Sequence, residues 1–129
     1  MPNDGRLTRR LIGVLRARLP ETRLDEVQDR RDARGRRWSL ATLLAAPIVA
    51  MCAGSKSLAE AEALTGEMSP AVRRVLGFRR RVPDTTMRDA LVRIEPDDLR
   101  LSLHAQIKAA NRRKALAPVG LPFGVVAMD

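Results

Sequence analysis

The acidic residues are the side chains most able to do chemistry in this sequence, and one of them stands in an unusual place. Asp129 directly follows "FGVVAM", a short apolar run from Phe123 to Met128. The last residues of a domain are usually polar, and they are poorly ordered unless they are tied down, so this apolar ending calls for an explanation. Asp129 is the first candidate for a catalytic carboxylate.

The other acids are better explained by structural roles. Asp97 and Asp98 fall in the first helical turn after Pro96, where the helix dipole favours negative charge. Three more acids lie on or beside a short capped helix, and another three lie in a segment whose arginines would neutralise them. We interpret these six as surface and ion-pair residues: Glu60, Glu62, Glu67, Asp25, Glu26 and Asp29.

Cysteine and histidine each occur once, as Cys52 and His104. One cysteine excludes an intramolecular disulfide, and a single Cys and a single His cannot make a structural zinc site. A reducing compartment fits this composition, and we expect a cytoplasmic location.

Positive charge dominates the 129 residues. Lys and Arg number 24 against 15 Asp and Glu, which gives a net charge of +9 and a pI near 11.4. Such a balance points to a polyanionic partner, most often nucleic acid. Aromatic residues are only 2% of the chain and Tyr is absent, so base stacking is poorly supported and the contact should be mostly with phosphate.

The arginines fall into clusters, as contact with phosphate by charge requires. Two basic connectors, residues 30–37 and 79–81, and one predicted helix, Thr85 to Ile94, supply the candidates. The DNA-binding residues expected from sequence are Arg30, Arg31, Arg34, Arg36, Arg37, Arg79, Arg80, Arg81, Thr85, Thr86, Arg88 and Arg93.

These side chains must be positioned by helices, because apolar residues recur at helical spacing along most of the chain. N-cap residues, prolines and glycines punctuate it, with Asp4, Ser39, Ser57, Ser69 and Asp84 as expected caps. A short helix and a basic loop are expected within residues 21–37. Further helices are expected over residues 5–19, 40–54, 58–64, 70–76, 85–94 and 96–114.

The sequence thus predicts a mainly α fold: a multi-helix domain over residues 1–116, with one short C-terminal strand. Residues 117–122, "APVGLP", are an expected linker, and residues 123–129 an expected strand, since the run is short and contains two β-branched residues.

The order of short helices before Thr85 is compatible with a helix-turn-helix. In that interpretation the helix from Thr85 to Ile94 would offer its polar side chains to a major groove. Three short helices separated by Gly or Pro are also common in helical domains of other kinds. A row on the last helix, Arg100, His104, Lys108 and Arg112, is more simply interpreted as a solvated charged face.

The uncharged stretch from Trp38 to Ser55 must be weighed as a membrane element. It is barely long enough to span a bilayer, and Pro47 stands in its middle. We interpret it as a buried core helix, with membrane insertion or export as the alternative.

Several blocks of the sequence, in their order and spacing, resemble bacterial insertion-sequence transposases of the H-repeat-associated type, which belong to the DDE superfamily. The resemblance runs from about Glu21 onward. The blocks are "DRRDARGRRWSLATLLA" (residues 29–45), "AGSKSLAEAEAL" (residues 53–64), "VPDTTMRDALVRIEPDDL" (residues 82–99) and "GVVAMD" (residues 124–129).

The resemblance implies a helical region followed by a ribonuclease-H-like catalytic domain, whose first strand carries the first of three acidic metal ligands. Asp129 matches that first acid, and Mg²⁺ or Mn²⁺ is implied for the full-length family. In-line attack on a phosphodiester uses two divalent ions held by several carboxylates. The family's second Asp and its Glu have no counterpart in these 129 residues, so we expect residues 123–129 to be the truncated start of the catalytic domain and the chain alone to be inactive.

Three functions remain open from sequence. The leading one is an N-terminal fragment of a DDE transposase that binds DNA at transposon ends. It would bind as a single chain, as a homodimer or together with full-length transposase. The second is a free-standing basic DNA-binding or regulatory protein, and the third a small membrane-associated protein.

Overall fold

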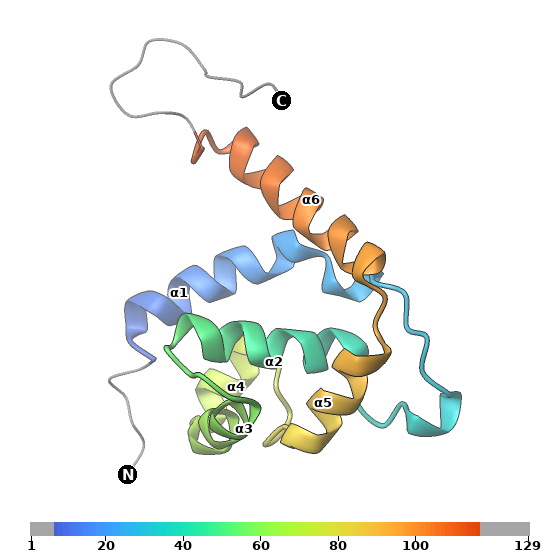
Figure 1. The fold of residues 1–129 in the computed structure, drawn as a ribbon. Coiled ribbons are helices and arrows are strands. Elements are labelled where there is room, and N and C mark those ends of the chain that lie inside the picture. Colours follow the sequence, from blue (N-terminus) through green and yellow to red (C-terminus); the bar gives the residue numbers. More distant parts are fainter. Residues whose placement is uncertain (1–6, 117–129) are drawn as a thin grey trace.

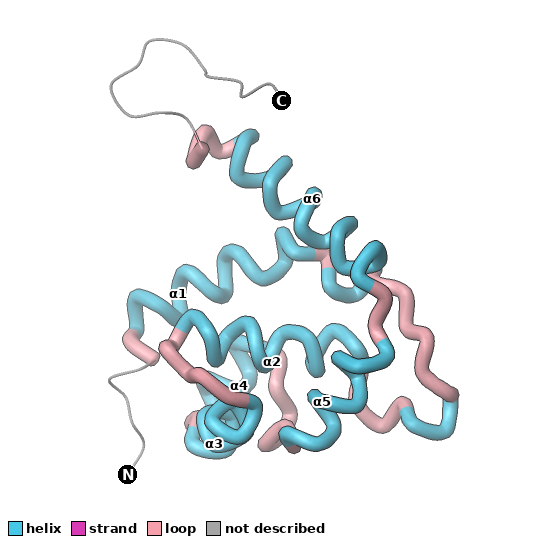
Figure 2. Tube along the Cα trace, viewed as in Figure 1, coloured by secondary structure: helices cyan, strands magenta, loops and turns pink. Residues whose placement is uncertain are grey.

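The structure, a computed structural model, describes residues 7–116, and this part of the chain is mainly helical (Figures 1 and 2). No strand occurs within residues 7–116. The predicted linker, the predicted strand, Asp129 and the predicted cap Asp4 lie outside the described residues. The α-helices are α1 (Arg9–Arg18), α2 (Leu40–Cys52), α3 (Leu58–Glu67), α4 (Pro70–Leu76), α5 (Asp84–Arg93) and α6 (Pro96–Arg112), and three 3₁₀ turns are η1 (Leu19–Thr22), η2 (Leu24–Glu26) and η3 (Ala33–Gly35).

The centre of the fold is α2, which is apolar around most of its circumference. A helix of that kind has to be buried on all sides, and α2 packs against α3, α5 and η2. Leu43 and Val49 are completely buried, as is Met87 of α5. Burying a side chain of this size stabilises the fold by about 1.5–3 kcal/mol. The interpretation of residues 38–55 as a buried core helix is therefore confirmed, and no helix within residues 7–116 is long and apolar enough to cross a membrane.

Several helix ends follow local sequence signals. The Ser39 hydroxyl accepts a hydrogen bond from the Thr42 amide at the start of α2 (3.2 Å), and Ser69 does the same for Val72 at the start of α4 (3.2 Å). Gly77 ends α4 with φ +86°, in the left-handed region that glycine tolerates best. These caps agree with the sequence prediction.

Other helix ends differ from the prediction. The first helix begins at Arg9, with Thr8 as its cap, and the segment from Glu21 onward forms 3₁₀ turns in place of a short α-helix. The helix predicted over residues 58–64 is longer than expected, because α3 continues through Gly66 to Glu67. There the Arg81 side chain lies directly against Gly66, where an added Cβ would meet Arg81 Cδ at 3.1 Å.

The start of α5 differs most clearly from the sequence prediction. Asp84 was expected to cap this helix, but it is the first helical residue and its side chain makes no cap. The carboxylate of Glu62 in α3 accepts the Asp84 N–H instead (2.8 Å). The cap therefore comes from a helix that precedes α5 by about 20 residues.

Helix α6 lies across η1 and projects away from the rest of the domain (Figure 1). The buried Ser102 hydroxyl donates to the Thr22 carbonyl (2.6 Å), and Arg113 pairs with Glu21 (2.9 Å). At the start of α6, Arg30 pairs with Asp98 (2.7 Å). These contacts fix α6 relative to η1 and to the segment that connects η2 to α2.

Candidate nucleic-acid interface

The basic segment before α2 is organised around Asp29. Arg31 is buried, and its guanidinium donates to Asp29 Oδ1 and Oδ2 (2.9 and 2.8 Å) and to the Trp38 carbonyl (2.8 Å). The hydrogen bond from Arg31 lowers the pKa of Asp29 from its usual 3.8 to about 2. The sequence placed Arg31 among the DNA-binding residues, but the structure uses it as an internal brace of this segment.

Two neighbouring arginines also hold this segment in place through hydrogen bonds within the protein. Arg36 folds back to donate to the Asp29 and Arg31 carbonyls (2.9 and 2.7 Å). Arg30 is held by Asp98 of α6, and this pairing lowers the pKa of Asp98. Arg34 and Arg37 differ, because within residues 7–116 their guanidinium groups have no hydrogen bond or ion pair and both side chains are exposed.

The second basic cluster meets the first at Trp38. The guanidinium carbons of Arg79 and Arg80 lie 5.9 and 4.8 Å from the centre of the buried Trp38 ring, which is cation–π geometry. Arg79 also donates to the Arg37 carbonyl (3.3 Å). Arg81 is directed elsewhere and pairs with Glu62 (2.6 Å). The Trp38 carbonyl accepts from Arg31 while its ring contacts Arg79 and Arg80, so one tryptophan joins arginines almost 50 residues apart in sequence.

A hollow of about 580 Å³ lies where η3, the connector after α4 and α5 meet. We call it the arginine hollow. Two aspartates, Asp32 and Asp89, also line it, so cations outnumber anions in its lining. Its basic residues are Arg31, Arg34, Arg37, Arg80 and Arg93.

The outer face of α5 continues from this hollow. Met87 and Ala90 are buried against the core, so the opposite side of the helix faces solvent. Thr85, Arg88 and Arg93 are exposed there, while Thr86 is half-buried and lines the hollow. This face is accessible, as reading a major groove would require.

The structure thus brings together, in one hollow, half of the twelve DNA-binding residues expected from sequence. The other six do not line this hollow. The six that line one hollow are Arg31, Arg34, Arg37, Arg80, Arg93 and Thr86. The pairing of Asp29 with arginines of its own segment was expected from sequence and is confirmed, whereas neither its main partner Arg31 nor Trp38 as the common contact was singled out. The only available signals were an Asp two residues before an Arg and a lone Trp beside Arg37.

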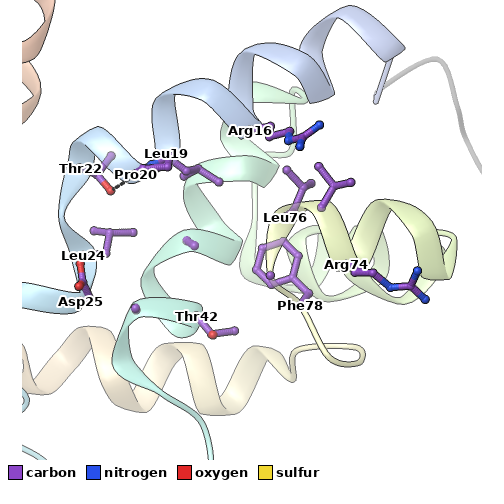
Figure 3. Close-up of a pocket in the computed structure, with 14 residues that line it drawn as sticks. Arg16, Leu19, Pro20, Thr22, Leu24, Asp25, Thr42, Arg74, Leu76 and Phe78 are labelled. Atoms are coloured by element: carbon purple, nitrogen blue, oxygen red, sulfur yellow. Dashed lines mark hydrogen bonds between the residues drawn. The ribbon is translucent and has the colours of Figure 1, made fainter.

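Two other hollows have mainly apolar linings and no evident catalytic set. Figure 3 shows one of about 330 Å³, where Leu76 and Phe78 face Leu24 across the space and the Thr22 hydroxyl donates to the Leu19 carbonyl. The other, of about 550 Å³, lies beside α2 and α6 and includes the buried Ser55 hydroxyl. Within residues 7–116, no three His, Cys, Asp or Glu side chains gather as a metal site would require.

Residues 21–105, about two thirds of the chain, match a protein-family model described as DDE_Tnp_1-associated. The match includes the Asp29–Arg31 brace, Trp38, the arginine hollow and the whole of α5. No curated protein and no solved structure matches the chain.

Proposed function

The chain belongs to the DDE_Tnp_1-associated family, and on this premise we propose that its helical domain binds duplex DNA for a DDE-type transposase. In this proposal the arginine hollow contacts the phosphate backbone, and the exposed face of α5 lies towards the adjoining groove. The order of sequence blocks supports the finer assignment to H-repeat-associated insertion sequences and to the ends of such elements.

The arginine hollow is the observation that carries the proposal. Its cations come from three segments, namely η3 with its flanks, the connector before α5, and α5 itself. Arginines are well suited to phosphate because the planar guanidinium donates several hydrogen bonds in a fixed fork. In Arg34, Arg37 and Arg93 these donors are not used in any ion pair within residues 7–116. The cost of gathering like charges is best explained by a polyanion that neutralises them.

The proposal assigns DNA binding, and no catalytic step, to the described residues. The resemblance implies Mg²⁺ or Mn²⁺ in the full-length family and matches Asp129 to one metal ligand, but Asp129 lies outside residues 7–116. Since the described part gathers no set of three metal-ligating side chains, we derive no step through a divalent ion.

The test is the affinity of an Arg34→Gln/Arg93→Gln variant for a fluorescently labelled duplex, measured by anisotropy over a range of salt concentrations. Because each lost phosphate contact removes counterion release, we expect about tenfold weaker binding at low salt and a salt slope smaller by up to about 2. Thermal unfolding should be unchanged, since both side chains are exposed.

The matched control is Arg9→Gln/Arg10→Gln, which removes the same charge from exposed positions at the start of α1. The control should bind within about twofold of the unmodified protein. Equal losses in the two variants would show that only net charge matters, and an affinity independent of salt would overturn the proposal.

A further inference from the structure

A second electropositive hollow, of about 500 Å³, lies between η2 and α6. We call it the α6 hollow. Its basic residues are Arg23, His104, Lys108 and Arg112, and Glu26 is the one acid in its lining. It includes part of the row on α6 that the sequence alone suggested was a solvated face.

Within residues 7–116, the cations of this hollow lack strong partners. Arg100, earlier in the same row, pairs with Asp97 (2.8 Å). Within residues 7–116, Lys108 and Arg112 make no ion pair. Arg23 approaches Glu26 only to 3.9 Å, with both side chains well exposed, and exposed pairs of this kind contribute little.

The backbone of Arg23, at the edge of this hollow, has an unusual conformation. Its φ is +49°, in the left-handed region, although it is not a glycine. A residue with a β-carbon pays about 1 kcal/mol for this conformation. The turn between η1 and η2 therefore holds an arginine at the edge of the α6 hollow in a backbone conformation that glycine would adopt more easily.

The two basic hollows are neighbours along the chain. Val27 lines the α6 hollow and Arg31 lines the arginine hollow, and four residues of extended chain span at most about 14 Å. The Arg30–Asp98 pair fixes this connection to the start of α6. Lys108 and Arg112 lie 10 and 14 residues beyond Asp98, or about 15 and 21 Å along α6, which is within the length of a duplex of two helical turns, about 70 Å.

We propose that the α6 hollow is a second phosphate site for the same duplex, with Lys108 and Arg112 contacting the phosphodiester backbone. This inference rests on the proposed DNA-binding function. It predicts that the basic face of α6 contacts the phosphodiester backbone of DNA and not only solvent.

The experiment compares a Lys108→Gln/Arg112→Gln variant with the two double variants described above, on a labelled duplex of about 20 base pairs, roughly two helical turns. We expect about tenfold weaker binding than the unmodified protein at low salt, and a salt slope smaller by up to about 2. A Lys108→Arg/Arg112→Lys variant, which keeps both charges, should bind within about twofold. Unchanged urea unfolding would show that these exposed substitutions leave the fold intact.

The outcomes separate the two proposals. If the α6 variant matches the Arg9→Gln/Arg10→Gln control while the Arg34→Gln/Arg93→Gln variant loses affinity, the second site is wrong and the proposed function stands. If both hollow variants match the control, both proposals fail. A titration at protein concentrations well above Kd should give one duplex per chain, and two duplexes per chain would overturn the shared-duplex geometry.

Discussion

At the scale of single residues, the arginines of this protein divide into internal braces and free cations. Arg31 and Arg36 close the segment around Asp29, and Arg30 ties that segment to α6. Arg34 and Arg37, from the same run, have no such partner within residues 7–116. The difference depends on which carboxylates and carbonyls the fold brings within reach, so composition alone cannot reveal it.

The Asp29–Arg31 pair predicts a pH dependence of stability. The pKa of Asp29 is about 2 in the folded protein against 3.8 ordinarily. This depressed pKa gives stability that is fully present above about pH 5 and is lost as pH falls through 4 towards 2. We expect a contribution on the order of 1–2 kcal/mol, since the carboxylate is partly screened by water. The measurement is urea unfolding at several pH values between 2 and 6.

The Asp29→Asn variant should lose that contribution at neutral pH, and its stability should fall less between pH 5 and pH 2. Glu21 and Asp98, whose pKa values are also lowered by paired arginines, would retain a dependence of the same sign. A pH profile that is identical in the variant and the unmodified protein would contradict the role given to Asp29.

At the scale of elements, helix ends are set partly by neighbouring residues and partly by distant ones. The Ser39 and Ser69 caps are local, and the sequence predicts them correctly. The cap of α5 comes from Glu62, which belongs to α3 and also pairs with Arg81. Glu62 thereby connects α3 to the start of the helix whose outer face we assign to DNA.

We predict that Glu62→Gln weakens the start of α5. Loss of a charged cap should cost about 1 kcal/mol of unfolding free energy and speed amide hydrogen exchange in the first turn of α5. Hydrogen exchange measured by NMR checks both the size and the location of the effect. Glu67→Gln, at the exposed end of the same helix, is the control and should change neither; an equal effect in both variants would show that α5 does not depend on this cap.

At the scale of the whole molecule, the excess of positive charge is not spread evenly. Within residues 7–116, ion pairs use many of the arginines, and several basic residues without an ion pair line the arginine hollow and the α6 hollow. A net charge of +9 would otherwise oppose compaction. Binding of a polyanion should therefore neutralise this positive charge and stabilise the fold.

A duplex should raise the melting temperature of the protein, and added salt should remove the increase. At a free duplex concentration of about 100 times Kd, linkage predicts close to 3 kcal/mol of stabilisation, or roughly 10 °C. Since phosphate contacts weaken steeply with salt, the shift should fall towards zero between low and moderate salt. Differential scanning fluorimetry checks this outcome, and a shift that persists at high salt would point to binding of a different kind.

The sequence by itself determined the mainly helical class, the buried character of α2, most of the local caps and the family resemblance. Each of these follows from patterns within a few turns of chain or from the order of sequence blocks, so no distant contact is needed to infer them. The buried Arg31, the Glu62 cap and the meeting of two arginine clusters at Trp38 were decided by tertiary structure alone. The Glu62 cap and the arginine contacts at Trp38 join segments that are distant in sequence, and the role of Arg31 depends on its burial. Only the packing of α2, α3 and α5 determines which charged side chains find partners and which face solvent.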